Sequence, residues 1–240
     1  MSLLDRRRSV WYAAAGGIVA IGAPTGLLIL REIYSPRPVT TEILSDQLTY
    51  LYVLFATVFV LAILGFALGR QADQLKALSE TDVLTGLPNR RALRQRLAME
   101  FRRAVRYGTP VSLLLVDIDG LKQLNDTDGH AAGDRLIRGV GTAITEGLRE
   151  SDFGARWGGD EFAIVAPNTS ARAARSSGER LLARVAEHGL DHRRPSSVSV
   201  GISTFDPADG AFANQDALVR AADQALYRAK TGGRNRVVAA

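Results

Sequence analysis

The sequence contains no cysteine and only three histidines among its 240 residues. Without cysteine the chain can form neither a disulfide nor a thiolate metal site, and a thiol nucleophile is excluded. Three histidines (His130, His188 and His192) give poor support for a zinc centre of the His/Cys type. The net charge of +5 is compatible with nucleic acid, anionic lipid or nucleotide partners and does not distinguish among them.

Charged residues are also missing from two long stretches near the N-terminus. Residues 10–30 and 48–68 are uncharged, and each stretch is 21 residues long. At about 1.5 Å per residue such a helix spans roughly 31 Å, the thickness of a bilayer core. A buried helix of a soluble protein would carry polar interruptions, and a signal peptide has a shorter apolar core. We therefore predict a membrane anchor over residues 1–69 with two transmembrane helices.

The basic flanks of these stretches predict their orientation. Three arginines at positions 6–8 precede the first stretch, and Arg70 and Lys76 follow the second. Positive residues favour the cytoplasmic side, so both termini are expected in the cytoplasm. Apolar residues recur at helical spacing just beyond the second stretch, which predicts a helical linker over 70–81 that could form a short coiled coil.

From Thr81 onward, strand and helix patterns alternate. Helices are expected at 89–107, 133–148, 171–188 and 215–230, and strands at 111–118, 152–157, 161–166, 196–204 and 236–238. The strands at 152–157 and 161–166 flank Gly158-Gly159, which predicts a tight hairpin. The pattern indicates an α/β (α+β) fold, a mixed sheet flanked by helices, over residues 82–240.

Acidic residues gather at two strand ends of this predicted sheet. Asp117 and Asp119 close the strand at 111–118, and Asp160 and Glu161 occupy the hairpin tip. If the strands are neighbours, the carboxylates converge and require a cation, and oxygen ligands favour Mg²⁺ or Mn²⁺. Two such ions can activate a hydroxyl for attack on phosphorus. The alternative, that these acids cap strands and turns, stays open, above all for Asp119.

Several segments together resemble one protein family. Gly158-Gly159-Asp160-Glu161-Phe162, preceded by Arg156-Trp157, is similar to the signature of the GGDEF diguanylate cyclases. Residues 82–91, 117–134 and 222–235 resemble the opening, nucleotide-binding and closing segments of that domain. The resemblance extends over about 81–238. It implies an enzyme that condenses two GTP into cyclic di-GMP and two pyrophosphates by 3′-hydroxyl attack across a homodimer.

The resemblance also implies roles for individual residues. Asp117, Asp160 and the Ile118 carbonyl would hold the metal ions, two Mg²⁺ or Mn²⁺ per site, and Asp160 and Glu161 would be catalytic. The implied substrate-binding residues are Gly120, Leu121, Lys122, Asn125, Asp134, Gly158, Gly159, Lys230 and Arg234. Among these, the cationic residues would neutralise the triphosphate, while Asn125 and Asp134 would read guanine. Gly120, Leu121 and Asp128 depart from the usual family pattern, which leaves nucleotide affinity less defined than reaction type.

The pair Arg149 and Asp152 resembles the family's inhibitory RxxD site, so cyclic di-GMP is expected as feedback inhibitor as well as product. The expected partners are GTP, cyclic di-GMP, a second copy of the chain and the membrane, with no nucleic acid. The expected location is the bacterial inner membrane, with the catalytic domain in the cytoplasm. The alternative function is a catalytically inactive GGDEF domain that senses cyclic di-GMP.

Overall fold

The protein is described by a computed structural model covering residues 22, 25–31, 33–34, 46–78, 80–187, 196–208 and 212–240, with the side chains of 72–78 left aside. The chain divides into two units, Met1–Ser79 and Glu80–Ala240. Two of the three histidines, His188 and His192, lie outside the described residues.

The first unit contains a long helix, α3 (Gln47–Leu78). Its segment Gln47–Gln71 is, within the described part of the chain, the one helix whose length and composition suit a membrane span. Large apolar side chains such as Phe55 and Phe66 are exposed on it. The predicted span 48–68 falls inside this helix, whereas most of the predicted span 10–30 lies outside the described residues. The structure therefore supports one candidate span and not the predicted two.

The second unit is built on a five-stranded mixed sheet in the order β2-β3-β1-β4-β5. All neighbouring pairs are antiparallel except β4 and β5, which run parallel. The strands are β1 (Val111–Ile118), β2 (Phe153–Gly158), β3 (Glu161–Pro167), β4 (Val198–Phe205) and β5 (Val237–Ala239). The predicted strands are confirmed to within about two residues at each end.

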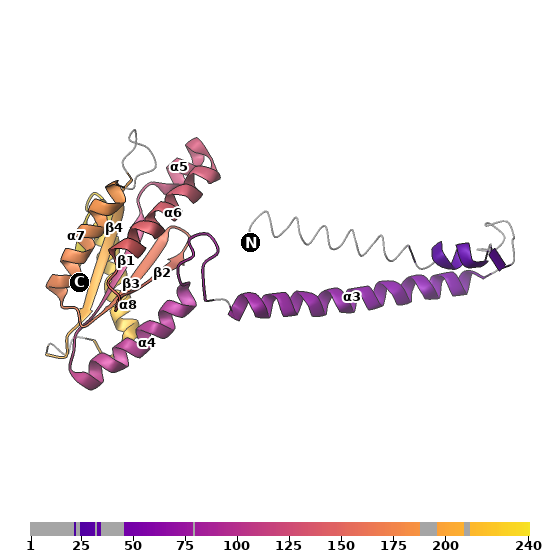
Figure 1. Ribbon diagram of the computed structural model, residues 1–240, viewed down its shortest axis with the longest axis horizontal. Helices are drawn as coiled ribbons and strands as arrows, with labels where there is room; N and C mark the ends of the chain where they lie inside the picture. The colour runs from indigo at the N-terminus through magenta and orange to yellow at the C-terminus, as the bar shows by residue number, and fades with distance from the viewer. Residues whose placement is uncertain are drawn as a thin grey trace. The chain divides into compact units, whose positions relative to one another are not determined.

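Helices cover both faces of this sheet (Figure 1). They are α4 (Arg90–Tyr107), α5 (Leu121–Asp128), α6 (His130–Gly147), α7 (Ala171–Glu187) and α8 (Gln215–Thr231). Helices α6 and α7 pack in one core cluster, and α4 and α8 pack in the other. Helix α5 was not predicted, and α6 begins at His130 rather than at the predicted residue 133. The reason is that α5 has only eight residues, of which Leu121 alone is buried.

Strand β1 is buried along its whole length and contributes to both cores. Successive side chains of a strand point to opposite faces, so Leu114 and Val116 join one core cluster while Leu113 and Leu115 join the other. The same alternation places Asp117 on the face covered by α8. The end of β1 therefore presents a carboxylate toward the C-terminal helix.

A glycine in β4 lets α8 lie directly against the sheet. A Cβ at Gly201 would collide with the backbone of α8 at Ala222 and Leu226, whose Cα would be only 2.6 Å away. Residues 222, 225, 226 and 229 of α8 are buried. This close approach brings the last turn of α8, which carries Lys230, to the end of β1.

Candidate active site

The tip of the β2–β3 hairpin lies beside the carboxyl end of β1. Asp117 pairs directly with Glu161 in the antiparallel ladder, so their side chains share one face of the sheet. The amide of Ile118 donates a hydrogen bond of 3.1 Å to the carbonyl oxygen of Asp160. The predicted adjacency of the two acidic strand ends is confirmed.

Asp117 is nearly buried and forms an ion pair with α8. Its side chain is 8% exposed, and the Lys230 ammonium lies 2.7 Å from its Oδ2. The pKa of Asp117 is raised to about 6, mainly by burial; the Lys230 ammonium lowers it, and the charges of Asp160 and Glu161 add to the rise. The carboxylate is thus held in an environment that favours additional positive charge.

An open cleft of about 500 Å³ adjoins these residues. Its lining includes eight of the predicted site residues, namely Asp117, Ile118, Gly120, Leu121, Lys122, Asp160, Lys230 and Arg234. Gln123, Asp126, Thr127 and Asp119 complete the lining. Glu161, Asn125, Asp134, Gly158 and Gly159 were predicted to contribute but are not among the lining residues. The cleft therefore combines carboxylates at one side with three cations.

The carboxylate of Asp119 is hydrogen-bonded to other parts of the protein. Its Oδ1 accepts a hydrogen bond of 2.7 Å from the Ser199 hydroxyl, and its Oδ2 accepts bonds from the Ser197 hydroxyl at 2.8 Å and the Asn235 amide at 3.1 Å. Three donors satisfy most of its acceptor capacity. The sequence left open whether Asp119 helps to bind a cation or caps strands and turns. The structure supports the second interpretation.

The predicted guanine-reading residues occupy the α5–α6 region. Asn125 lies against Gly133, because a Cβ on that glycine would come within 2.9 Å of the Asn125 side-chain carbon Cγ. The Oδ1 atom of Asn125 is buried and has no hydrogen-bond partner among the described residues. Asp134 is exposed on α6. His130 is exposed at the start of α6.

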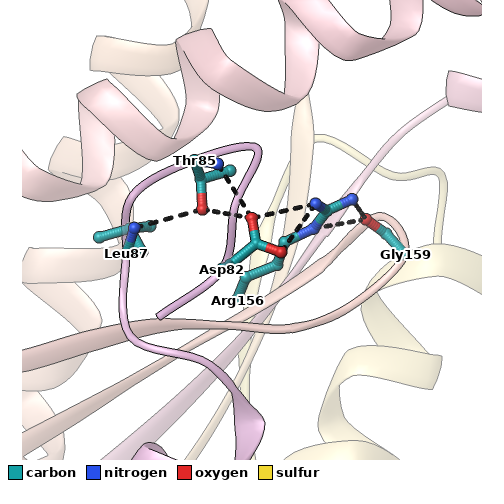
Figure 2. A network of polar contacts seen from close by, with 5 residues as sticks. All are labelled: Asp82, Thr85, Leu87, Arg156 and Gly159. Carbon is teal, nitrogen blue, oxygen red and sulfur yellow. Dashed lines mark hydrogen bonds and ion pairs between the residues drawn. The ribbon is translucent and has the colours of Figure 1, made fainter. Parts of the chain in front are cut away.

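A polar network missed by the sequence analysis fixes the hairpin tip (Figure 2). The Arg156 guanidinium donates to both carboxylate oxygens of Asp82 at 3.1 Å and, through Nε and Nη2, to the Gly159 carbonyl at 3.1 and 2.7 Å. Burial of Asp82 disfavours ionisation, but hydrogen bonds from Thr85 and Arg156 outweigh it and lower the pKa of Asp82. Gly159 has φ +50°, a conformation that favours glycine. The occurrence of Asp82 and Arg156 in the matched segments was the only sequence signal for this link.

The predicted inhibitory residues form a turn before β2. The Arg149 amide donates to Asp152 Oδ2 at 3.1 Å, and the Asp152 amide donates to the Arg149 carbonyl at 3.0 Å. Both residues border a small cavity of about 30 Å³ that Arg180 and Arg184 of α7 also line. The structure thus brings the RxxD pair together with two further arginines.

The donor set of the cleft suits a divalent cation only in part. Within the described residues, no group of three histidine, aspartate or glutamate side chains forms a ready-made metal site. Asp117, Asp160 and the Ile118 carbonyl offer oxygen ligands, which suit a hard ion such as Mg²⁺ that keeps positions open for water or phosphate. The residues therefore fit a metal shared between protein and substrate.

Comparisons with known proteins agree with this architecture. Diguanylate cyclase DgcP of Pseudomonas aeruginosa is 42% identical over 160 residues, which are 65% of this chain and 23% of that protein. Diguanylate cyclase DosC of Escherichia coli is 39% identical over 156 residues, 65% of this chain and 34% of that protein. The chain therefore spans about a quarter to a third of the length of these curated relatives.

Solved structures are similar as well. The GGDEF domain of DgcB from Caulobacter crescentus, in complex with c-di-GMP, has a TM-score of 0.63 and 35% identity, covering 67% of this chain and 95% of that one. Diguanylate cyclase SiaD of Pseudomonas aeruginosa, in complex with its activator SiaC, has a TM-score of 0.63 and 30% identity over 98% of this chain and 88% of that one. The family model described as "Diguanylate cyclase, GGDEF domain" matches residues 79–236. With that match and the hairpin–strand geometry in place, the chain belongs to the GGDEF diguanylate cyclase family.

Proposed function

We propose that this protein condenses two GTP molecules into cyclic di-GMP with release of two pyrophosphates. The single observation that carries the proposal is the pairing of Asp117 with Glu161, which sets the hairpin tip and the end of β1 at one cleft. Three cations, Lys122, Lys230 and Arg234, line the same cleft. Carboxylates beside cations in one cleft suit a metal-dependent reaction of a polyphosphate.

The metal would be held by Asp117, Asp160 and the carbonyl oxygen of Ile118. We propose two Mg²⁺ or Mn²⁺ ions per site. When bound, the ions supply charge that favours the attacking 3′-oxygen and the departing pyrophosphate. The raised pKa of Asp117 supports this assignment, because a buried carboxylate with acidic neighbours gains from an added cation.

The triphosphate would lie between the cations and the start of α5. Gly120 is the N-cap of helix α5 and has φ +73° and no side-chain cap hydrogen bond. The amides of the first turn are therefore free of a capping side chain, and such amides favour anions. Lys230 would turn from Asp117 to phosphate once a metal ion neutralises that carboxylate. In this way Lys122, Lys230 and Arg234 would balance the charge of the nucleotide.

Guanine would be recognised by Asn125 and Asp134. The Oδ1 of Asn125 has no hydrogen-bond partner among the described residues and would accept from the 2-amino group of guanine. The Asp134 carboxylate can accept from N1–H and the 2-amino group. Adenine offers no such pair of donors, so the arrangement favours GTP over ATP.

Two copies of the domain would be needed, because one cleft holds one GTP. Each 3′-oxygen attacks the α-phosphorus of the opposite GTP, forming a P–O bond as the bond to the β-phosphate bridging oxygen breaks. Each attack releases one pyrophosphate and one hydroxyl proton. Glu161 faces Asp117 across the ladder and would stabilise the reacting 3′-hydroxyl. The active form is therefore proposed to be a homodimer.

Feedback inhibition is proposed at Arg149 and Asp152. The arginine would bind a phosphate of cyclic di-GMP and the carboxylate would hold a guanine. The nearby Arg180 and Arg184 support this assignment, because they add positive charge at the edge of the same cavity.

The helix α3 supports placement at the bacterial inner membrane, with the catalytic domain on the cytoplasmic side.

The proposal is tested by incubating the purified chain with GTP and Mg²⁺ and separating the products by mass. Cyclic di-GMP and pyrophosphate in a 1:2 ratio are expected. Their absence, together with retained binding of cyclic di-GMP, would instead support the inactive sensor. The variant Asp160→Asn is the matched control and is expected to form no product.

A further inference from the structure

Three distant segments of the chain meet at the Asp119 carboxylate. Asp119 follows the end of β1, Ser197 and Ser199 lie at the start of β4, and Asn235 lies in the loop after α8. The Asp119 amide also donates to the Ser197 carbonyl at 3.0 Å. Together with the three bonds that its carboxylate accepts, this makes Asp119 the junction between the two central strands and the C-terminal loop.

The loop that Asp119 holds has a strained backbone. Gly233, Arg234 and Asn235 follow one another with φ values of +115°, +60° and +45°. Positive φ is unfavourable for a non-glycine residue, although asparagine tolerates it better than most. Such conformations persist where surrounding contacts fix them, and they gather at functional sites. The hydrogen bond from the Asn235 amide to Asp119 is one such contact.

The strained loop carries a cleft residue. Arg234 lines the cleft together with Asp117, Asp160 and Lys230. Its own backbone is fixed on both sides, because its amide donates to the Ala229 carbonyl at 3.0 Å and its carbonyl accepts from Arg236 Nε at 3.1 Å. The position of its guanidinium therefore depends on a loop that Asp119 contacts through the Asn235 amide.

We propose that Asp119 is a positioning residue that fixes the Gly233–Asn235 loop and thereby holds Arg234 in the nucleotide cleft. This inference rests on the proposed function only for the nature of the ligand, the triphosphate of GTP. It assigns a role to the second aspartate of the Asp117-Ile118-Asp119 segment that is distinct from metal binding. The Asp119 carboxylate accepts three hydrogen bonds from the protein, so Asp119 acts through Arg234.

The first test is a double-variant cycle with Asp119→Ala, Arg234→Ala and the combined variant. Loss of hydrogen bonds to a charged group is worth roughly 1.5–3 kcal/mol, so each single variant is expected to raise the KM for GTP about 10- to 100-fold, with a smaller change in kcat. If Asp119 acts through Arg234, the combined variant has the KM of the more severe single variant. If the increases in KM of the two single variants multiply in the combined variant, the proposal is overturned.

Two controls separate positioning from general damage. Asp119→Asn keeps an acceptor for the Asn235 amide, so it is expected to recover most of the affinity lost in Asp119→Ala. Asp223→Ala removes an exposed carboxylate from α8 and is expected to leave KM unchanged. A KM of Asp119→Asn as high as that of Asp119→Ala, at equal thermal stability, contradicts the proposal.

The second test does not depend on GTP. Hydrogen exchange of the Asn235 amide reports its bond to Asp119 directly. In Asp119→Ala this amide is expected to exchange at least about 10-fold faster, while amides in the centre of β1 keep their protection. Unchanged exchange at Asn235 would overturn the proposal, even for a chain that makes cyclic di-GMP. An accelerated exchange in a chain with no cyclase activity would instead count against the proposed function alone.

Discussion

Arg156 links Asp82, at the beginning of the domain, to the carbonyl oxygen of Gly159 at the hairpin tip. The Arg156 side chain is 15% exposed and that of Asp82 is 23% exposed, so the ion pair is largely shielded from water. The guanidinium has donors on two edges and can bind a carboxylate and a carbonyl at once. The β2–β3 hairpin is therefore linked to the turn at Asp82–Leu87 (Figure 2).

Replacing Arg156 with alanine is expected to lower kcat at least about 10-fold, because the tip that carries Asp160 loses its anchor. A cost of roughly 1–3 kcal/mol in the free energy of unfolding is also expected, since Asp82 is left without its charged partner. Urea unfolding and initial-rate assays measure the two effects. Arg175→Ala, which removes an exposed ion pair with Glu179 on α7, is the matched control and should cost under about 1 kcal/mol.

The pKa of Asp117 predicts a pH-dependent stability of the metal-free protein. Because its pKa is about 6 in the folded state and 3.8 in the reference state, ionising Asp117 costs the folded state on the order of 3 kcal/mol. The free energy of unfolding is therefore unaffected by Asp117 below pH about 4, and it falls as the pH rises through about 6. Asp117→Asn is therefore expected to melt higher than the wild type at pH 8, in EDTA, and equally at pH 4.

Asp223→Asn serves as the control for the same change of charge, and its melting temperature should track the wild type at both pH values. Adding Mg²⁺ with GTP is expected to stabilise the wild type and not Asp117→Asn. A constant difference between Asp117→Asn and the wild type from pH 4 to pH 8 would show that burial of the charge is not its cause.

Gly133→Ala tests the guanine-reading role of Asn125. The new methyl group would collide with the Asn125 amide and force it to move. The KM for GTP is expected to rise about 10-fold or more, and discrimination against ATP should weaken. Gly147→Ala lies in the same helix, where its Cβ would meet only Arg184 at 3.6 Å, and should leave both quantities unchanged.

Gly201→Ala tests the packing of α8 against β4, which places Lys230 at the end of β1. The Cβ would meet the backbone of α8, which cannot yield as a flexible side chain can. A loss of about 3 kcal/mol or more in unfolding free energy is expected. Gly178→Ala on α7 would place its Cβ 3.2 Å from the Val237 side chain and should be better tolerated. Equal stability of the two variants would contradict the close approach of α8 and β4.

Arg149→Ala tests the proposed feedback site. If Arg149 binds a phosphate of cyclic di-GMP as proposed, its loss is expected to raise the inhibitory concentration of cyclic di-GMP at least about 10-fold without lowering the initial rate. Progress curves with added product measure this effect. Arg172→Ala, an exposed arginine at the start of α7, is the control and should keep normal inhibition. Inhibition unchanged in Arg149→Ala would reject the site.

Local patterns explain which parts of the fold the sequence could predict. Strand β1 was predicted at its observed bounds because eight residues ending in Asp117-Ile118 form an almost uninterrupted apolar run. The hairpin followed from Gly158-Gly159. Helix α5 was missed because eight largely polar residues with one buried leucine carry little periodic signal.

Long-range contacts explain what the sequence could not predict in the site. The ion pair of Lys230 with Asp117 and the bonds of Arg156 with Asp82 join residues far apart in the chain. Their geometry depends on how α8 and the domain's opening turn pack on the sheet, and no local pattern encodes that packing. The role of Asp119 stayed open for the same reason, since its donors come from β4 and the last loop.

The ion pair between Lys230 and Asp117 affects the charge balance at the end of β1. An ionised Asp117 would repel the two acids beside it, and the Lys230 ammonium on α8 offsets part of this repulsion. The domain can therefore complete its fold before any nucleotide arrives. Under the proposed function, metal and GTP would replace this internal counter-ion and would free the Lys230 ammonium for the phosphates of the nucleotide.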